Sequence, residues 1–176
     1  MSRHGYHEDL GSEDTWAYVR WRGAVASATR GARGQAMLRD LLAALEAMPD
    51  KRLVAESFVE PEEGACCTLG ALCVARGVDV SDLQAVDPDD FCGDEAADIM
   101  ADRLGVARAL TAEIMYENDS AWFDCKTVVV HGPVEWKGKQ FPMTRLVSDP
   151  AGAEHRRWKY MHRWVKSRIS APAVGA

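Results

Sequence analysis

Cysteine and histidine are the side chains of this sequence best suited to nucleophilic or metal chemistry, with five of each. The cysteines are Cys66, Cys67, Cys73, Cys92 and Cys125. Their spacing does not match a zinc site, which normally uses two pairs with two to four residues inside each pair. A thiol at the turn before a helix, such as Cys66 or Cys67, would have a lowered pKa and could act as a nucleophile. No local spacing supplies its histidine partner, so we expect small buried side chains, no catalytic residue and no cofactor.

Two further groups resemble metal sites and lack the required spacing. His155 and His162 share a face of the last expected helix but lie two turns apart, too far to hold one ion. Asn118 and Asp119 offer oxygen ligands for a hard cation, without the alternating carboxylates and central glycine of an EF-hand loop. We therefore predict that the Asn-Asp pair caps the element that follows it, and we predict no metal site.

An anion site is predicted where two arginines and a glycine precede a helix. Arg30, Arg33 and Gln35 are its candidate residues, because free N–H groups at a helix start and guanidinium groups both attract phosphate. The segment matches neither a P-loop nor a dinucleotide-binding fingerprint. The alternative is that these arginines pair with carboxylates of the same chain.

The last expected helix carries bases interleaved with aromatic residues, a composition typical of nucleic-acid or protein interfaces. Trp158 falls on the apolar stripe of this helix, whereas Trp164 lies about 60° from that stripe and is predicted to be half exposed. Bases and Trp164 of this helix, together with residues near the expected hairpin turn, form the candidate partner-binding set. Its members are Trp136, Lys137, Lys139, Arg156, Arg157, Lys159, Arg163 and Trp164.

Apolar periodicity predicts the elements that position these residues. Helices are expected over 13–29, 38–48, 69–77, 88–104, 107–117 and 152–169, and a short strand over 52–60. The β-branched run after residue 126 predicts a hairpin that turns near Lys137-Gly138-Lys139. The fold class is therefore mainly α, a single α+β domain of five or six helices with a small β-hairpin or sheet. Residues 1–12 and 170–176 are expected to be flexible, and the domain covers 13–169, with the hairpin at 126–147 as an insertion.

Composition supports one ordinary globular domain. The 176 residues are 47% hydrophobic, and no apolar run approaches the length of a membrane span. The polar, acidic N-terminus does not resemble a signal peptide, so we expect reduced thiols and a cytoplasmic protein that does not engage membranes. A homo-oligomer is compatible with the sequence.

The net charge of −6 conceals two basic regions around an acidic middle. Residues 54–125 carry three bases against seventeen acids, whereas residues 126–176 carry ten bases against three acids. This arrangement predicts either internal charge pairing on folding or a two-faced surface that attracts a partner. The acidic total argues against general DNA binding.

Several segments resemble a widespread family of helical proteins from tailed phages and prophages. They follow the pattern RWRGAV, RGxRGQ, CxLGAL, an Asn-Asp pair and RRWxxMxRWV, over about residues 5–120 and 153–168. No activity is known for this family, so the resemblance supplies no catalytic residues. It implies a bacterial cytoplasm and a phage genome, and the chain departs from the family pattern at 121–147.

Together these observations predict a non-enzymatic phage accessory protein that binds a host bacterial protein, a defence-system component among them. The first alternative is a module that binds nucleic acid or a nucleotide or other anion. The second alternative is an enzyme that uses Cys66 or Cys67, or a metal near Asn118 and Asp119.

Overall fold

The computed structural model describes residues 15–60, 62–83, 93–119, 121–136 and 139–171. Its helices are α1 Thr15–Arg30, α2 Ala32–Ala47, α3 Thr68–Arg76, α4 Gly93–Leu104, α5 Arg108–Asp119 and α6 Ala153–Arg168. Short 3-10 turns lie at Ser81–Leu83, Ala121–Asp124 and Pro150–Gly152. One antiparallel sheet pairs β1 Cys125–Trp136 with β2 Lys139–Ser148. This confirms the predicted mainly-α, α+β class.

A leucine stripe on α2 forms the centre of the core. Leu38, Leu41 and Leu45 are fully buried, as their spacing of three and four residues predicts. Helices α3, α5 and α6 cover this stripe with apolar side chains that include Leu69, Leu72, Leu110, Ile114, Met161 and Val165. The amphipathic pattern of the sequence therefore places the core correctly.

The corner between α1 and α2 depends on a glycine. Gly31 separates the two helices, and α2 begins at Ala32, before the helix expected over 38–48, so Gly34 lies inside α2 and is buried. A Cβ on Gly34 would overlap the carbonyl oxygen of Ala28 and lie 3.3 Å from Leu110 Cδ2. Gly34 thus allows the end of α1 and the Leu110 side chain of α5 to approach α2 closely.

The predicted strand at 52–60 is wrong. This segment is extended, but in the described part of the chain its strand-type pairing is one isolated bridge, Val59 to Cys66. Its backbone groups bond to distant residues instead of a sheet: Leu53 N–H donates to Glu154 O at 3.2 Å, and Phe58 O accepts from Cys67 N at 3.1 Å. The backbone hydrogen-bonding groups of this extended segment therefore find their partners at helix ends, because no strand lies beside it in the described structure.

Several predictions fall on residues outside the described ranges. They include the start of the helix expected over 88–104, the flexible terminus 1–12, and most of the tail 170–176. Helix α4 is described from Gly93 onward. Among the described residues, no helix has the length and apolarity needed to cross a bilayer.

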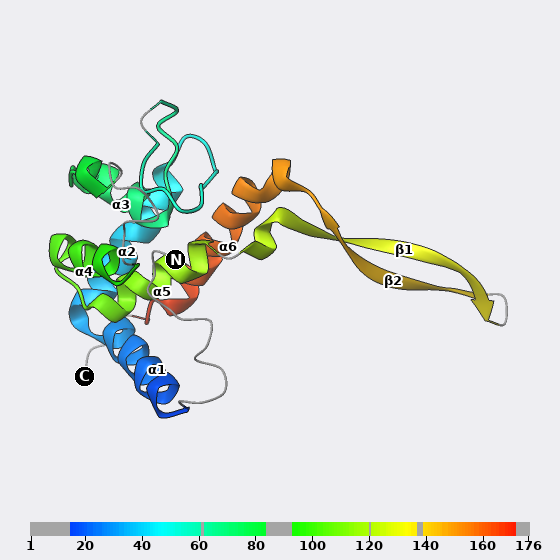
Figure 1. Cartoon of the computed structure of the whole chain (residues 1–176), viewed down its shortest axis with the longest axis horizontal. Coiled ribbons are helices and arrows are strands. Elements are labelled where there is room, and N and C mark those ends of the chain that lie inside the picture. Colours follow the sequence, from blue (N-terminus) through cyan, green and yellow to red (C-terminus); the bar gives the residue numbers. More distant parts are fainter. Residues whose placement is uncertain (1–14, 61, 84–92, 120, 137–138, 172–176) are drawn as a thin grey trace.

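The β-hairpin extends away from the helices as a long, twisted ribbon (Figure 1). We call this ribbon, residues 125–148, the arm. Its register pairs Cys125 with Ser148 at the root and Trp136 with Lys139 at the tip, which confirms the predicted turn position. Pairing is irregular between His131 and Glu135. The structure confirms the hairpin, while its origin as an insertion stays a prediction.

Candidate functional site

The arm exposes apolar side chains on both of its faces. Residues paired across an antiparallel ladder share a face, as do residues two apart on one strand. Leu146 pairs with Thr127, two residues before Val129, so Val129 and Leu146 lie on one face, and the pair Val130 and Met143 lies on the other. Val129 is 62% exposed, Met143 58% and Leu146 69%. A ribbon covered by the helical body would bury one of these faces, so the arm offers two uncovered apolar surfaces.

The root of the arm is held by a charged cluster around Asp149. The Asp149 carboxylate accepts from Arg156 Nη1 at 2.8 Å and lies 3.3 Å from Lys126 Nζ. Its backbone N–H donates to Asp124 O at 2.7 Å, which joins the two ends of the arm. The hydrogen bonds from Arg156 and then Lys126 hold the pKa of Asp149 below its usual range. This cluster fixes where the arm leaves α6.

Aromatic rings pack beneath this charged cluster. Phe123 is fully buried, and its ring lies 5.4 Å from that of Tyr160 and 3.9 Å from that of Trp122. The Tyr160 hydroxyl donates a hydrogen bond to Glu117. Burial, and secondly this hydrogen bond, raises the pKa of Tyr160. Trp122 itself remains half exposed, in the 3-10 turn that precedes the arm. None of these aromatic residues was selected from the sequence.

Some residues of the predicted partner-binding set are buried or bonded within the fold, and others are exposed. Trp164 is only 6% exposed, so the prediction that it is half exposed is wrong. Arg157 is buried as well, and donates to Asn118 O and Leu53 O, both at 2.8 Å. Arg156 belongs to the arm root, with Nε donating to Phe123 O at 2.9 Å.

Only part of the set remains available at the surface. Lys159 and Arg163 are exposed on α6. Trp136 and Lys139 face each other in the ladder at the tip, and the described structure extends to their backbone pairing alone. Lys137 lies outside the described residues.

The predicted anion-site residues do not converge. Arg30 ends α1, and Arg33 is exposed in the first turn of α2. Gln35 is buried and uses its amide for structure: Nε2 donates to Thr29 O at 2.7 Å and to Arg168 O at 2.9 Å. Gln35 therefore fastens the α1–α2 corner to the end of α6.

The Asn118 side chain caps α3, which precedes it in the chain, whereas the sequence predicted a cap on the element that follows. Its Oδ1 accepts from Thr68 N at 3.1 Å and from Thr68 Oγ1 at 2.7 Å. Its Nδ2 donates to Val54 O at 3.0 Å, and Asp119 Oδ1 accepts from the same group at 2.8 Å. Within the described residues, no group of three or more histidine, cysteine or acidic side chains could hold a metal ion.

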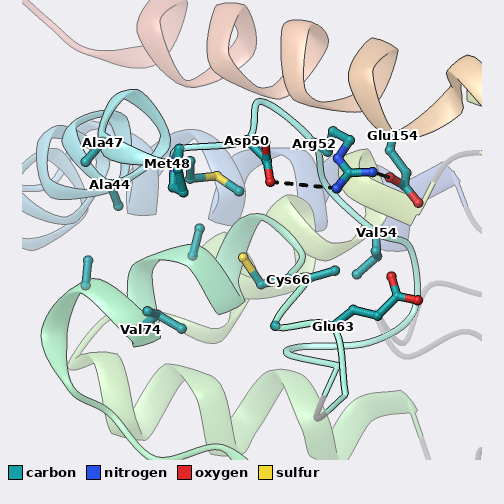
Figure 2. Close-up of a pocket in the computed structure, with 15 residues that line it drawn as sticks. Ala44, Ala47, Met48, Asp50, Arg52, Val54, Glu63, Cys66, Val74 and Glu154 are labelled. Carbon is teal, nitrogen blue, oxygen red and sulfur yellow. Dashed lines mark ion pairs between the residues drawn. The ribbon is translucent and has the colours of Figure 1, made fainter.

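A groove of about 440 Å³ lies between the end of α2, α3 and the start of α6 (Figure 2). Its surface is formed largely by small apolar residues, among them Ala44, Ala71 and Val74. Arg52 lies at one side, 3.7 Å from Asp50 and 3.8 Å from Glu154. Because carboxylates already flank Arg52, the groove is unsuited to an anion.

The cysteine nucleophile prediction loses its electrostatic basis at Cys66. Burial raises the pKa of Cys66 to about 11 and that of Cys73 to about 12, where the nucleophile hypothesis needs a lowered value. Cys67 is buried at the start of α3, and its Sγ accepts from Gly70 N at 3.4 Å. The histidines of α6 bond elsewhere, His155 with Lys51 O and His162 with Glu46.

Alkylation should therefore separate the cysteines. At pH 8 we expect iodoacetamide to modify the partly exposed Cys125 first, and Cys66 and Cys73 at least about 100-fold more slowly, because only the thiolate attacks. Peptide mapping by mass spectrometry gives the rate at each site, and the urea-unfolded chain is the control in which the sites react alike. Cys66 modified as fast as Cys125 would contradict this expectation.

Comparisons with protein-family models, curated proteins and solved structures find no match to this chain. Inference about its function therefore starts from its own surfaces, of which the arm is the most distinctive.

Proposed function

We propose that this chain is a non-enzymatic accessory protein that binds another protein through the arm. The observation that carries the proposal is a two-stranded ribbon with exposed aliphatic side chains on both faces. The resemblance to phage and prophage proteins makes a bacterial host protein in the cytoplasm the expected partner, with defence-system components as the first candidates. The raised pKa of Cys66 argues against chemistry at that thiol and so favours binding.

The energetics of a lone hairpin support a partner. A two-stranded ribbon is at best marginally stable in water, and a third strand or a packed face normally stabilises it. Full burial of Val129, Met143 or Leu146 would contribute about 1.5–3 kcal/mol each. Both strands are also sheet edges, because the sheet has two strands, so either edge could accept a strand from the partner.

Charge indicates what should surround the apolar contact. Residues 126–148 contain four lysines or arginines and one glutamate. A partner surface with an apolar centre and acidic rim would complement this composition. The same positive charge is compatible with nucleic acid, but aliphatic side chains such as Val129 and Leu146 do not supply the stacking that single strands require.

Site-specific photo-crosslinking tests the proposal. A benzophenone amino acid at Val129 or Leu146, in bacterial cells that contain this protein, should give a discrete protein adduct heavier than the 19.4 kDa chain. The matched control is Val74, which is 64% exposed but lies on α3. We expect no discrete adduct at Val74.

A second variant links the adduct to the arm surface. With the probe at Val129, the double substitution Met143→Asp and Leu146→Asp should remove the adduct, and far-UV circular dichroism should be unchanged because both side chains face solvent. Equal adducts from Val74 and Leu146 would contradict the proposal. A nuclease-sensitive adduct would favour the nucleic-acid alternative, and an adduct of twice the chain mass would indicate self-association.

A further inference from the structure

A smaller cavity, of about 230 Å³, lies where α1, α5 and the end of α6 meet. Arg22 and Arg30 contribute to it from α1, Glu113 from α5, and Ser167 and Arg168 from α6. The α1 residues that line it, at positions 22, 25, 26, 29 and 30, follow one face of the helix. Three arginines from two helices, all of them exposed residues, thus contribute to the lining of one small space.

The charges of this cavity do not balance. Glu113 is 1% exposed and pairs with Arg22 at 3.6 Å. Within the described part of the chain, no carboxylate pairs with Arg30 or Arg168. The C-terminal ends of α1 and α6 each contribute about half a negative charge. Counted over these described groups, about one positive charge remains without a partner, which distinguishes this cavity from the groove at Arg52.

The walls of the cavity are held in place before any ligand arrives. Gln35 bonds to the carbonyl oxygens of Thr29 and Arg168, and its Oε1 accepts from Ser170 N at 2.8 Å. The Arg168 guanidinium lies 5.0 Å from the centre of the buried Trp164 ring. Two of the arginine-bearing helix ends are thus fixed relative to each other, which lowers the entropic cost of binding.

We propose that this cavity binds a single phosphate group, as free phosphate or a small phosphate monoester, between Arg30 and Arg168. Guanidinium forks match the oxygens of a tetrahedral oxyanion and donate strong charge-assisted hydrogen bonds. Drug-sized ligands occupy pockets of about 300–1,000 Å³, so this cavity suits a smaller group. Arg22 stays with Glu113 and adds positive potential, while Gln35 positions the walls and does not touch the ligand.

Calorimetric titration with inorganic phosphate, at constant ionic strength set with potassium chloride, tests the proposal. The wild-type chain should bind phosphate saturably, and the variant Arg30→Gln with Arg168→Gln should bind about 10- to 100-fold more weakly. Arg33→Gln is the matched control, because Arg33 is a nearby exposed arginine that does not line the cavity. Its affinity should stay within about twofold of wild type.

O-phosphoserine in place of phosphate distinguishes the two sources of the ligand: tighter binding than phosphate indicates a monoester, and weaker binding indicates the free ion. Absence of saturable binding by the wild type, or equal affinity of the double variant, would overturn the proposal. Thermal unfolding without phosphate checks that the double variant is folded. If it is not, Arg30→Gln alone carries the comparison, with the same outcomes. The result is independent of the arm, since Met143→Asp with Leu146→Asp should leave phosphate affinity unchanged.

Discussion

Replacement of Asn118 by leucine should lower the free energy of unfolding by about 4 kcal/mol. Asn118 is 1% exposed, and its amide bonds to Thr68 N, Thr68 Oγ1 and Val54 O. Leucine has a similar size and leaves little cavity, but those three buried groups lose their partner. Each unsatisfied group costs about 1–3 kcal/mol. The loss should be large because one side chain joins α5, the start of α3 and the 52–60 segment.

Urea unfolding followed by circular dichroism measures this change. Thr68→Val is the matched control, because it removes one hydroxyl and keeps the Thr68 N–H bonded to Asn118, so we expect a loss of about 1 kcal/mol. A chelator should leave the midpoint of both variants and the wild type unchanged, since the amide of Asn118 is engaged with protein groups. A loss below about 1 kcal/mol for Asn118→Leu would contradict the assigned role.

The helices could be predicted from sequence because each carries its own apolar stripe. Leu38, Leu41 and Leu45 reveal α2 without reference to any other segment. The failed strand at 52–60 shows the opposite situation. Its composition favours an extended backbone, but strand pairing requires a neighbour, and here Asn118 and Arg157 supply the hydrogen bonds from far along the chain.

The candidate sites were less predictable, because they depend on which arginines the fold uses internally. Arg157 and Lys159 look equivalent in a basic helix, yet Arg157 reaches two backbone carbonyls inside the fold and Lys159 does not leave the surface. The face shared by Arg22 and Arg30 could be read from helical spacing. The position of Arg168 in the same lining could not be predicted, because it depends on how α6 packs against α1 and α5.

The exposed apolar faces of the arm had a partial signal in the sequence. A half-buried strand alternates apolar and polar residues, whereas residues 128–130 are three consecutive valines. Such a run is typical of a strand covered on both faces. The sequence therefore indicates a ribbon that is covered on both faces, whereas the described helices leave apolar side chains exposed on both faces.

Substitution of Gly70 by alanine should lower the free energy of unfolding by about 3–5 kcal/mol. Gly70 is buried in the first turn of α3, where a Cβ would overlap the carbonyl oxygen of Phe58 and lie 2.7 Å from its carbonyl carbon. The same carbonyl accepts from Cys67 N, so the backbone cannot move away without loss of that bond. Helix propensity alone would predict the opposite sign, since alanine is favoured over glycine by about 1 kcal/mol.

Gly23→Ala is the matched control for the sign of the stability change. Gly23 is exposed in α1, and no heavy atom outside its own helix turn lies within 4 Å of an added Cβ. It should raise the stability by about 0.5–1 kcal/mol, about 1–4 °C in Tm for a chain of this size. Thermal unfolding of both variants therefore separates propensity from steric overlap. A rise in Tm for Gly70→Ala would show that the 52–60 segment does not press against α3, and the contact between Phe58 and Gly70 would have to be abandoned.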